Sequence, residues 1–247
     1  MRVYDGLRRV RALRRLVGRL PVPAVCAWYR ARTRLLRGYS DADPCRLLWL
    51  DPRSIRSTEG RGGQCRIGVV MDGDWDRTAF PLMEDERYAD IQRLYEGGLA
   101  SGTRRQAPHR LPPQTLERLD RIFESIRRHG YLSQRALLRL DRPTTERLNN
   151  DVVHPVFNEI GVNVYRDGTL VRTGGGFHRL ALATALGVPS VPVIVRVRHA
   201  AWQAIRREVA GARRPEELSG SALAHLRHPD LVDLVPSDWL TPGSMPG

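Results

Sequence analysis

The sequence predicts an α/β fold of the α+β kind, with helices packed on a compact mixed sheet. The apolar run "LLWL" at 47–50 ends at Asp51-Pro52, which is typical of a strand that enters a turn. Residues 161–165 and 169–173 alternate around Asp167-Gly168, a pair that tight hairpin turns favour. Segments with apolar residues at helical spacing separate these strands, so strands and helices alternate along the chain.

A basic helical extension is predicted over residues 1–40, with a break at Pro21 and Pro23. Arg residues fill one face of this segment, and the other face carries apolar residues at helical spacing: Leu7, Val10, Leu13, Val17 and Leu20. Two interpretations stay open. The segment lies on nucleic acid or an anionic membrane, or it packs on the domain and leaves its Arg face in solvent.

The main domain is predicted over 41–200, with an insertion at about 60–113 in which 97–114 is the best candidate for a mobile loop. Helices are expected at 113–130 and 176–186, and a strand at 190–199. Alternation places Arg196 and Arg198 of that strand on one face. This face is either a basic rim of the binding pocket or the solvent side of an edge strand, and we favour the edge strand. Residues 201–247 are expected to form an Arg-rich helix and a short polar tail.

Charge, cysteine spacing and hydropathy limit the partners, the kinds of site and the location that we expect. The 247 residues include 40 basic residues, all Arg, against 27 acidic ones, and the formal net charge of +13 favours phosphates, nucleic acid or anionic membranes. Cys26, Cys45 and Cys65 are widely spaced, which argues against a zinc site or a disulfide scaffold. No apolar run approaches the ~20 residues of a membrane span, and a cytoplasmic protein is expected.

The most informative stretch is "RTGGGFHR" at 172–179, where a predicted strand leads through three glycines into an apolar helix. Positive charge is unfavourable in the first turn of a helix, yet His178 and Arg179 lie there. A bound phosphate would explain this placement, because helix N–H groups, Arg and His all donate hydrogen bonds to phosphate. The candidate phosphate-binding residues are Arg172, Gly174, Gly175, Gly176, His178 and Arg179. A strand-to-helix turn with no ligand is the alternative.

The segment "GGGFHRLALATALGVPSVPVIV" at 174–195 resembles the nucleotide-binding motif of the ParB/sulfiredoxin superfamily. "LERLDRIFESIRRHGYLSQRALL" at 116–138 and "LLWLDPRSI" at 47–55 resemble a helix and the first strand of the same fold. The resemblance covers roughly 46–198. It implies a domain that binds a nucleotide such as ATP, ADP or CTP.

The branches of that superfamily differ in their chemistry. Sulfiredoxins carry a catalytic Cys inside the motif, where this chain has Phe177. Partition proteins place a DNA-binding module after the domain, and the remaining residues are too few for it. The resemblance is closest to the free-serine kinases, which have a His-Arg motif and a glutamate base. It implies phosphate transfer to a hydroxyl-bearing substrate, with Glu59 as the base and His178 as its catalytic partner.

Two further expectations concern a metal ion and a second function. Asp72, Asp74 and Asp76 alternate in "MDGDWDR" and could hold Mg²⁺ beside nucleotide phosphates, although solvated turn carboxylates have the same pattern. The alternative function is a non-catalytic DNA-associated module, in which the basic N-terminal helix contacts the phosphate backbone.

Overall fold

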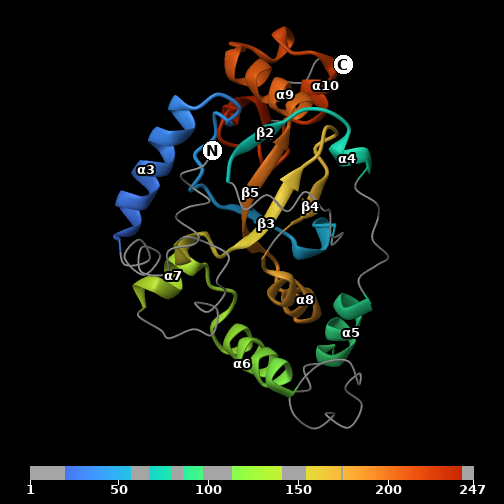
Figure 1. The fold of residues 1–247 in the computed structure, drawn as a ribbon. Helices are drawn as coiled ribbons and strands as arrows, with labels where there is room; N and C mark the ends of the chain where they lie inside the picture. The colour runs from blue at the N-terminus through green and yellow to red at the C-terminus, as the bar shows by residue number, and fades with distance from the viewer. Residues whose placement is uncertain are drawn as a thin grey trace.

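A computed structural model describes residues 20–56, 67–78, 86–96, 113–140, 154–173 and 175–240. A mixed sheet lies at the centre of these residues (Figure 1). Its five strands are β1 (Leu48–Leu50), β2 (Val69–Met71), β3 (Ile160–Val164), β4 (Leu170–Arg172) and β5 (Val191–His199). The predicted α/β class is confirmed.

Strand β5 is the central strand of the sheet. On one side it pairs in parallel with β3, and β3 pairs antiparallel with β4. On its other side β1 pairs antiparallel with the first half of β5, and β2 pairs in parallel with the second half. The expectation that this strand is an edge strand is therefore wrong.

The hairpin at Asp167-Gly168 is confirmed, between β3 and β4. Gly168 has a φ of 82°, and the Asp167 carboxylate accepts a hydrogen bond from the Thr169 backbone N–H at 2.9 Å. A side chain on Gly168 would also collide with the ring of Trp202, which comes within 2.7 Å of the Cβ position. The turn and the packing of Trp202 both require glycine here.

Eight α-helices lie within the described ranges. They are α3 (Val22–Leu35), α4 (Trp75–Thr78), α5 (Glu86–Tyr95), α6 (Pro113–His129), α7 (Gln134–Arg139), α8 (Phe177–Ala185), α9 (Ala200–Gly211) and α10 (Gly220–Ala224). The helices predicted at 113–130 and 176–186 are confirmed as α6 and α8. Glu59 and most of the loop predicted at 97–114 lie outside the described residues.

The main hydrophobic core packs α8 and α6 against one face of the sheet. Leu180, Leu182, Ile160 and Val193 are all fully buried in it. Tyr95 of α5 joins the same cluster, and α5 packs on α8. Residues 179–183 of α8 are all buried, which explains the apolar sequence of most of this helix.

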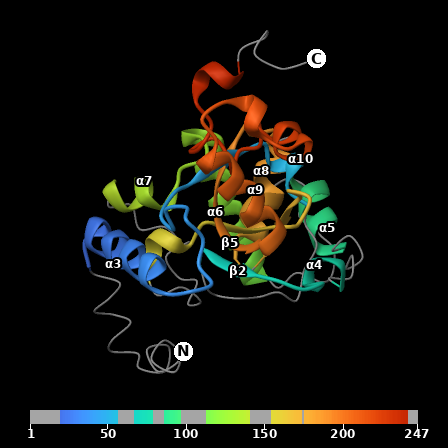
Figure 2. The ribbon, with the colours of Figure 1, turned by 90° about the horizontal axis from the view of Figure 1, so that it is seen from above.

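Helix α3 packs in a second, smaller hydrophobic cluster. Val25, Cys26 and Tyr29 contact a group that includes Ile194, whose neighbours Val193 and Val195 belong to the main core. Two views place α3 and α5 on opposite sides of the sheet (Figures 1 and 2). This part of the predicted extension is packed on the domain, and residues 1–19 lie outside the described residues.

The C-terminal segment is more structured than the polar tail that the sequence predicts. After α9, residues 215–240 form two 3₁₀ turns and α10, and they bury Leu226, Leu231 and Trp239. The prediction missed this because the apolar residues are spread among short turns, without the periodicity of a helix or strand. The segment caps the end of the sheet from which β5 leads into α9 (Figure 1).

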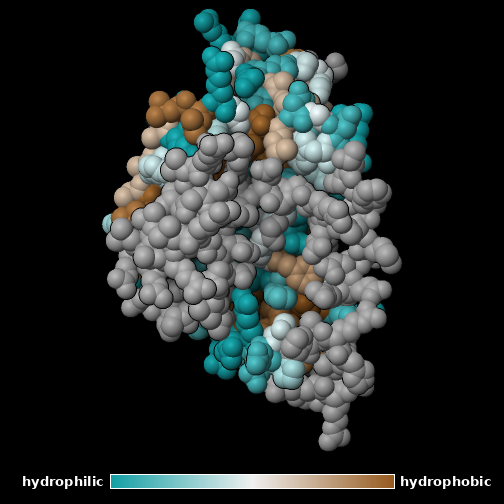
Figure 3. Space-filling model, viewed as in Figure 1, coloured by the Kyte–Doolittle hydropathy of each residue, from teal (hydrophilic) through white to brown (hydrophobic). Residues whose placement is uncertain are grey.

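Among the described residues, no helix has the length and apolar character needed to cross a membrane. On the face shown in Figure 3, hydrophilic residues predominate over α9 and α10. A hydrophobic patch lies over the end of α3, where Leu35 is 82% exposed.

Candidate functional site

The glycine loop leads from β4 into α8. Gly176 is the residue before the helix and has a φ of 94°. A Cβ on Gly176 would lie 2.7 Å from the Cα of Ile160 in β3. Gly175 is less constrained, because the nearest atom to its Cβ position is Asn158 Oδ1 at 3.9 Å. Gly174 lies outside the described residues.

The N terminus of α8 has neither a side-chain cap nor an acidic residue in its first turn. The first N–H groups of a helix have no partner within the helix and carry partial positive charge. This end of α8 therefore offers the local field that phosphate binding requires.

Arg179 faces the protein interior. It is 5% exposed, donates to the backbone carbonyl of Asn158, and lies 3.7 Å from the Glu159 carboxylate. Glu159 is fully buried and also accepts a hydrogen bond from the Gln134 backbone N–H at 2.6 Å. A buried carboxylate thus supplies counter-charge for a cation in the first turn of α8, and it connects α8 to the start of α7.

Arg172 lies beside the first residue of α8. Its guanidinium carbon is 5.1 Å from the centre of the Phe177 ring, an arrangement in which a cation is attracted to the ring face. Tyr88 of α5 packs against the same ring, with centroids 5.9 Å apart. Burial raises the pKa of Tyr88, whose hydroxyl group is 3.0 Å from that of Thr184. The Arg172 charge is therefore held between β4, α5 and α8.

His178 lies in the first turn of α8 and is partly exposed, whereas Arg179 in the same turn is buried. Its ring is half-buried and packs edge-on against Phe177, with centroids 5.4 Å apart. The described structure thus brings together Arg172, Gly175, Gly176 and His178 around the start of α8. The position of Glu59 relative to this group stays a prediction.

The three aspartates near β2 have partners within the protein. Arg166 contacts Asp76 at 2.5 Å and Asp74 at 2.9 Å, and Asp72 accepts a hydrogen bond from the Gly73 backbone N–H at 2.8 Å. The hydrogen bond from Arg166 lowers the pKa of Asp76 to about 2. Among the described residues, no group of three or more His, Cys, Asp or Glu side chains is arranged to hold a metal ion.

The strand arginines are buried, and this corrects the expectation that they face solvent. Arg196 is 4% exposed and donates to the Phe157 carbonyl at 3.0 Å, next to an irregularity in the pairing of β3 and β5. Arg198 is 3% exposed and holds both carboxylate oxygens of Asp230, at 2.8 and 2.6 Å. The partner of Arg198 lies 32 residues away in the C-terminal segment, where the sequence pattern offers no signal for it.

Comparisons with protein-family models, with curated proteins and with solved structures find no match to this chain.

Proposed function

We propose that this protein is a nucleotide-binding domain of the ParB/sulfiredoxin type and that the start of α8 holds a phosphate group of the nucleotide. The observation that carries the proposal is the uncapped N terminus of α8, which directly follows a glycine in the left-handed conformation. A strand–glycine loop–helix unit with an uncapped helix N terminus is the arrangement in which proteins bind phosphates through backbone N–H groups.

Each predicted residue takes a defined part in this proposal. The backbone of Gly175 and Gly176 lies next to the phosphate, and His178 donates a hydrogen bond to it from the first turn. Arg172 adds positive charge from β4. Arg179 is a positioning residue, because its contacts with Asn158 and Glu159 fix the start of α8 to the preceding segments.

We propose phosphate transfer to a hydroxyl acceptor as the activity of this site. Glu59 would accept the proton of the attacking hydroxyl group while the start of α8 holds the transferred phosphate, and the nucleotide, shortened by that phosphate, would be the leaving group. The aspartates near β2 do not fit the Mg²⁺ of the sequence prediction, because Arg166 already neutralises Asp74 and Asp76. No step of the proposed transfer is assigned to them.

Calorimetric titration tests the binding step. The purified chain is titrated with ATP, ADP, CTP and GTP, each with and without Mg²⁺, and at least one nucleotide is expected to bind saturably. His178→Ala should weaken that nucleotide at least tenfold. The exposed His129 at the end of α6 provides the matched control, and His129→Ala should leave the affinity unchanged. Equal affinities in the two variants would remove the α8 site from the proposal.

Turnover of the same preparations tests the catalytic step. With free serine as acceptor, the terminal phosphate of the bound nucleotide is expected to appear on the serine hydroxyl group. Glu59→Gln should abolish transfer and keep nucleotide affinity. Undiminished transfer by this variant would exclude Glu59 as the base.

The alternative, a DNA-associated module, is favoured by the exposed basic face of α3. Arg30 and Arg34 are exposed there, and the chain carries a net charge of +13. This alternative predicts retention on duplex DNA that falls steeply with salt and does not change in His178→Ala.

A further inference from the structure

The side of α3 that points away from the domain carries exposed apolar residues. Val25, Cys26 and Tyr29 hold the inward side of this helix in the second hydrophobic cluster. Trp28 and Leu35 lie seven residues apart, on one side of the helix, and they are 47% and 82% exposed. The exposed alanines on that side are Ala24, Ala27 and Ala31. These five residues form the outer face of α3, which belongs to neither hydrophobic cluster.

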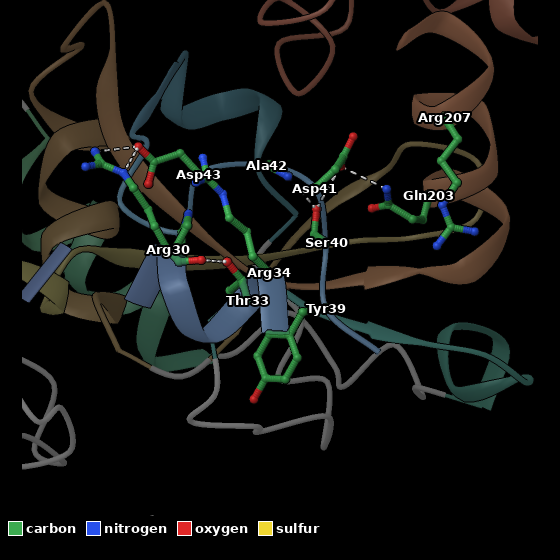
Figure 4. A pocket seen from close by; sticks show the side chains of 11 residues that line it. Arg30, Thr33, Arg34, Tyr39, Ser40, Asp41, Ala42, Asp43, Gln203 and Arg207 are labelled. Atoms are coloured by element: carbon green, nitrogen blue, oxygen red, sulfur yellow. Dashed lines mark hydrogen bonds and ion pairs between the residues drawn. The ribbon is translucent and has the colours of Figure 1, made fainter. Parts of the chain in front are cut away.

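Arginine side chains lie along both edges of the outer face. Arg30 and Arg34 are on the edge toward α9, where they line a polar cavity of about 370 Å³ beside α3 (Figure 4). Arg32 is on the other edge, because it follows Trp28 by four residues. Its guanidinium carbon is 5.7 Å from the centre of the Trp28 ring, and it donates to the Tyr39 hydroxyl group at 2.9 Å. The outer face is therefore an apolar strip with positive charge on both sides.

The positive charge beside the outer face is only partly neutralised. Helix α3 contains no Asp or Glu. Asp43 pairs with Arg30 at 2.7 Å, and Asp41, the other carboxylate at the cavity, is bound by side chains of α9. The exposed side chains of Arg34 and Arg37 have neither an ion pair nor a hydrogen bond within the described part of the chain. An anionic partner would supply the counter-charge that these two arginines lack.

The combination of exposed apolar residues and positive charge favours one kind of partner. A second copy of the chain would bring arginines against arginines at this face. Duplex DNA would neutralise the arginines but would leave Trp28 and Leu35 without apolar contacts. The surface of an anionic membrane offers charged headgroups for the arginines and an acyl-chain boundary for the apolar strip. Tryptophan is enriched at this boundary, because its ring is apolar and its N–H group can stay hydrated.

We propose that the outer face of α3 binds the surface of a membrane that contains anionic lipids. The helix lies in the plane of the interface, with Trp28 and Leu35 at the boundary between headgroups and acyl chains. Arg34 and Arg37 contact the lipid headgroups. The inward side of α3 stays in the second hydrophobic cluster, so the domain remains on the aqueous side. This binding does not depend on the phosphate site proposed at α8.

Sedimentation with vesicles tests the role of charge. The full chain is mixed with vesicles of phosphatidylcholine alone and with vesicles that also contain phosphatidylserine. It should bind the anionic vesicles at least tenfold more tightly, and added salt should weaken this binding. Arg34→Gln/Arg37→Gln should lose at least tenfold in affinity for the anionic vesicles. Arg139→Gln/Arg213→Gln removes the same charge at exposed positions away from α3 and should stay within about threefold of the wild type.

Two further comparisons test the role of the apolar strip. Lipids with brominated acyl chains quench the fluorescence of tryptophans that reach the acyl-chain boundary. Trp28→Phe should remove most of this quenching, whereas Trp49→Phe, at a 54% exposed position of β1, should not. Leu35→Ser should bind the anionic vesicles at least fivefold more weakly. Val232→Ser, at a 59% exposed position of the C-terminal segment, should bind them like the wild type.

Several results would overturn the proposal. They are a wild type that does not bind anionic vesicles, equal losses in the two double variants, unchanged binding by the Leu35 variant, and quenching that persists in the Trp28 variant. If the arginine variant loses retention on duplex DNA and the Trp28 and Leu35 variants bind vesicles like the wild type, α3 serves a nucleic-acid surface and the proposal is wrong. His178→Ala should bind vesicles like the wild type, which separates this result from that for the α8 site.

Discussion

Packing and backbone conformation alone require glycine at position 176, although this residue belongs to the predicted phosphate-binding motif. Its φ of 94° is rare for other residues, and its Cα approaches β3 so closely that a methyl group would lie 2.7 Å from the Ile160 backbone. The start of α8 thus depends on this glycine for its position. Gly175 has no such contact, so two adjacent glycines of the motif have different roles.

The two glycines give a matched pair for mutagenesis. Gly176→Ala should lower the free energy of unfolding by at least about 2 kcal/mol, because it adds both a strained φ and a clash with β3. Gly175→Ala should change it by less than about 1 kcal/mol. Urea unfolding of both variants measures the difference. Equal small losses would contradict the close packing of the loop on Ile160.

Arg179 marks the limit of sequence reasoning at the same site. Its place in the first turn of an apolar helix predicts a nearby anion, and an anion is present. That anion is the Glu159 carboxylate, 3.7 Å away across a tertiary contact. The sequence pattern predicts that an anion lies near Arg179, but only the structure shows which group supplies the negative charge.

At the scale of elements, α3 shows how a basic helix is held on the domain. Tyr29 is 4% exposed and packs on Phe157, with ring centroids 4.4 Å apart. The exposed pair between Arg30 and Asp43 adds a weak link, since surface ion pairs contribute about 0–1 kcal/mol. The small hydrophobic cluster therefore supplies most of the attachment.

Truncation of Tyr29 tests this attachment. Tyr29→Ala should lower the free energy of unfolding by about 3 kcal/mol and increase amide hydrogen exchange in α3 more than in α8. Leu35→Ala, at an 82% exposed position of the same helix, should stay within about 0.5 kcal/mol of the wild type. Unchanged exchange in the Tyr29 variant would mean that the second cluster does not hold α3.

Elements with strong local signals could be predicted from the sequence, and those that depend on distant partners could not. The apolar stripe of α6, the Asp167-Gly168 turn and the Gly187-Pro189 stop after α8 are local features, and these elements are confirmed. The burial of Arg198 depends on Asp230 in the C-terminal segment, and the central place of β5 depends on its pairing with β2 and β3. For the site, the residues around the start of α8 could be found, and the cavity beside α3 could not.

At the scale of the molecule, Asp230 connects β5, α9 and the segment just before β1. Its buried carboxylate binds Arg198, the Trp202 indole N–H at 3.0 Å, and Arg46 at 3.0 Å. Arg206 of α9 donates to the Asp230 backbone carbonyl and pairs with Asp233 at 3.0 Å. Burial alone would raise the pKa of Asp230, but the surrounding arginines hold this pKa below its usual range.

The buried His154 and the half-buried His228 are both held neutral by hydrogen bonds with the backbone. In His228 and His154, Nδ1 accepts a backbone N–H, so the proton is on Nε2, which faces a backbone carbonyl. Burial lowers the pKa of both rings. Protonation at Nδ1 would put a second donor against a backbone N–H, at Asp230 in the case of His228.

These contacts predict that acid destabilises the whole molecule in two steps. For a group whose pKa is lower in the folded state, the stabilisation is complete above the unfolded pKa and is lost as the pH falls. The free energy of unfolding should therefore decrease below about pH 6.5, where unfolded histidines protonate, and again below about pH 4, where unfolded aspartates protonate. Urea titrations at a series of pH values measure both steps.

Variants assign each step to its group. His228→Asn keeps an acceptor near the Asp230 N–H and should reduce the decrease between pH 7 and 5, whereas His129→Asn, at an exposed position, should not. Asp230→Asn should cost about 3–5 kcal/mol at pH 7, because it leaves buried arginines without their carboxylate, and should reduce the second step. A pH profile of Asp230→Asn that runs parallel to the wild type below pH 4 would show that other carboxylates carry the acid response.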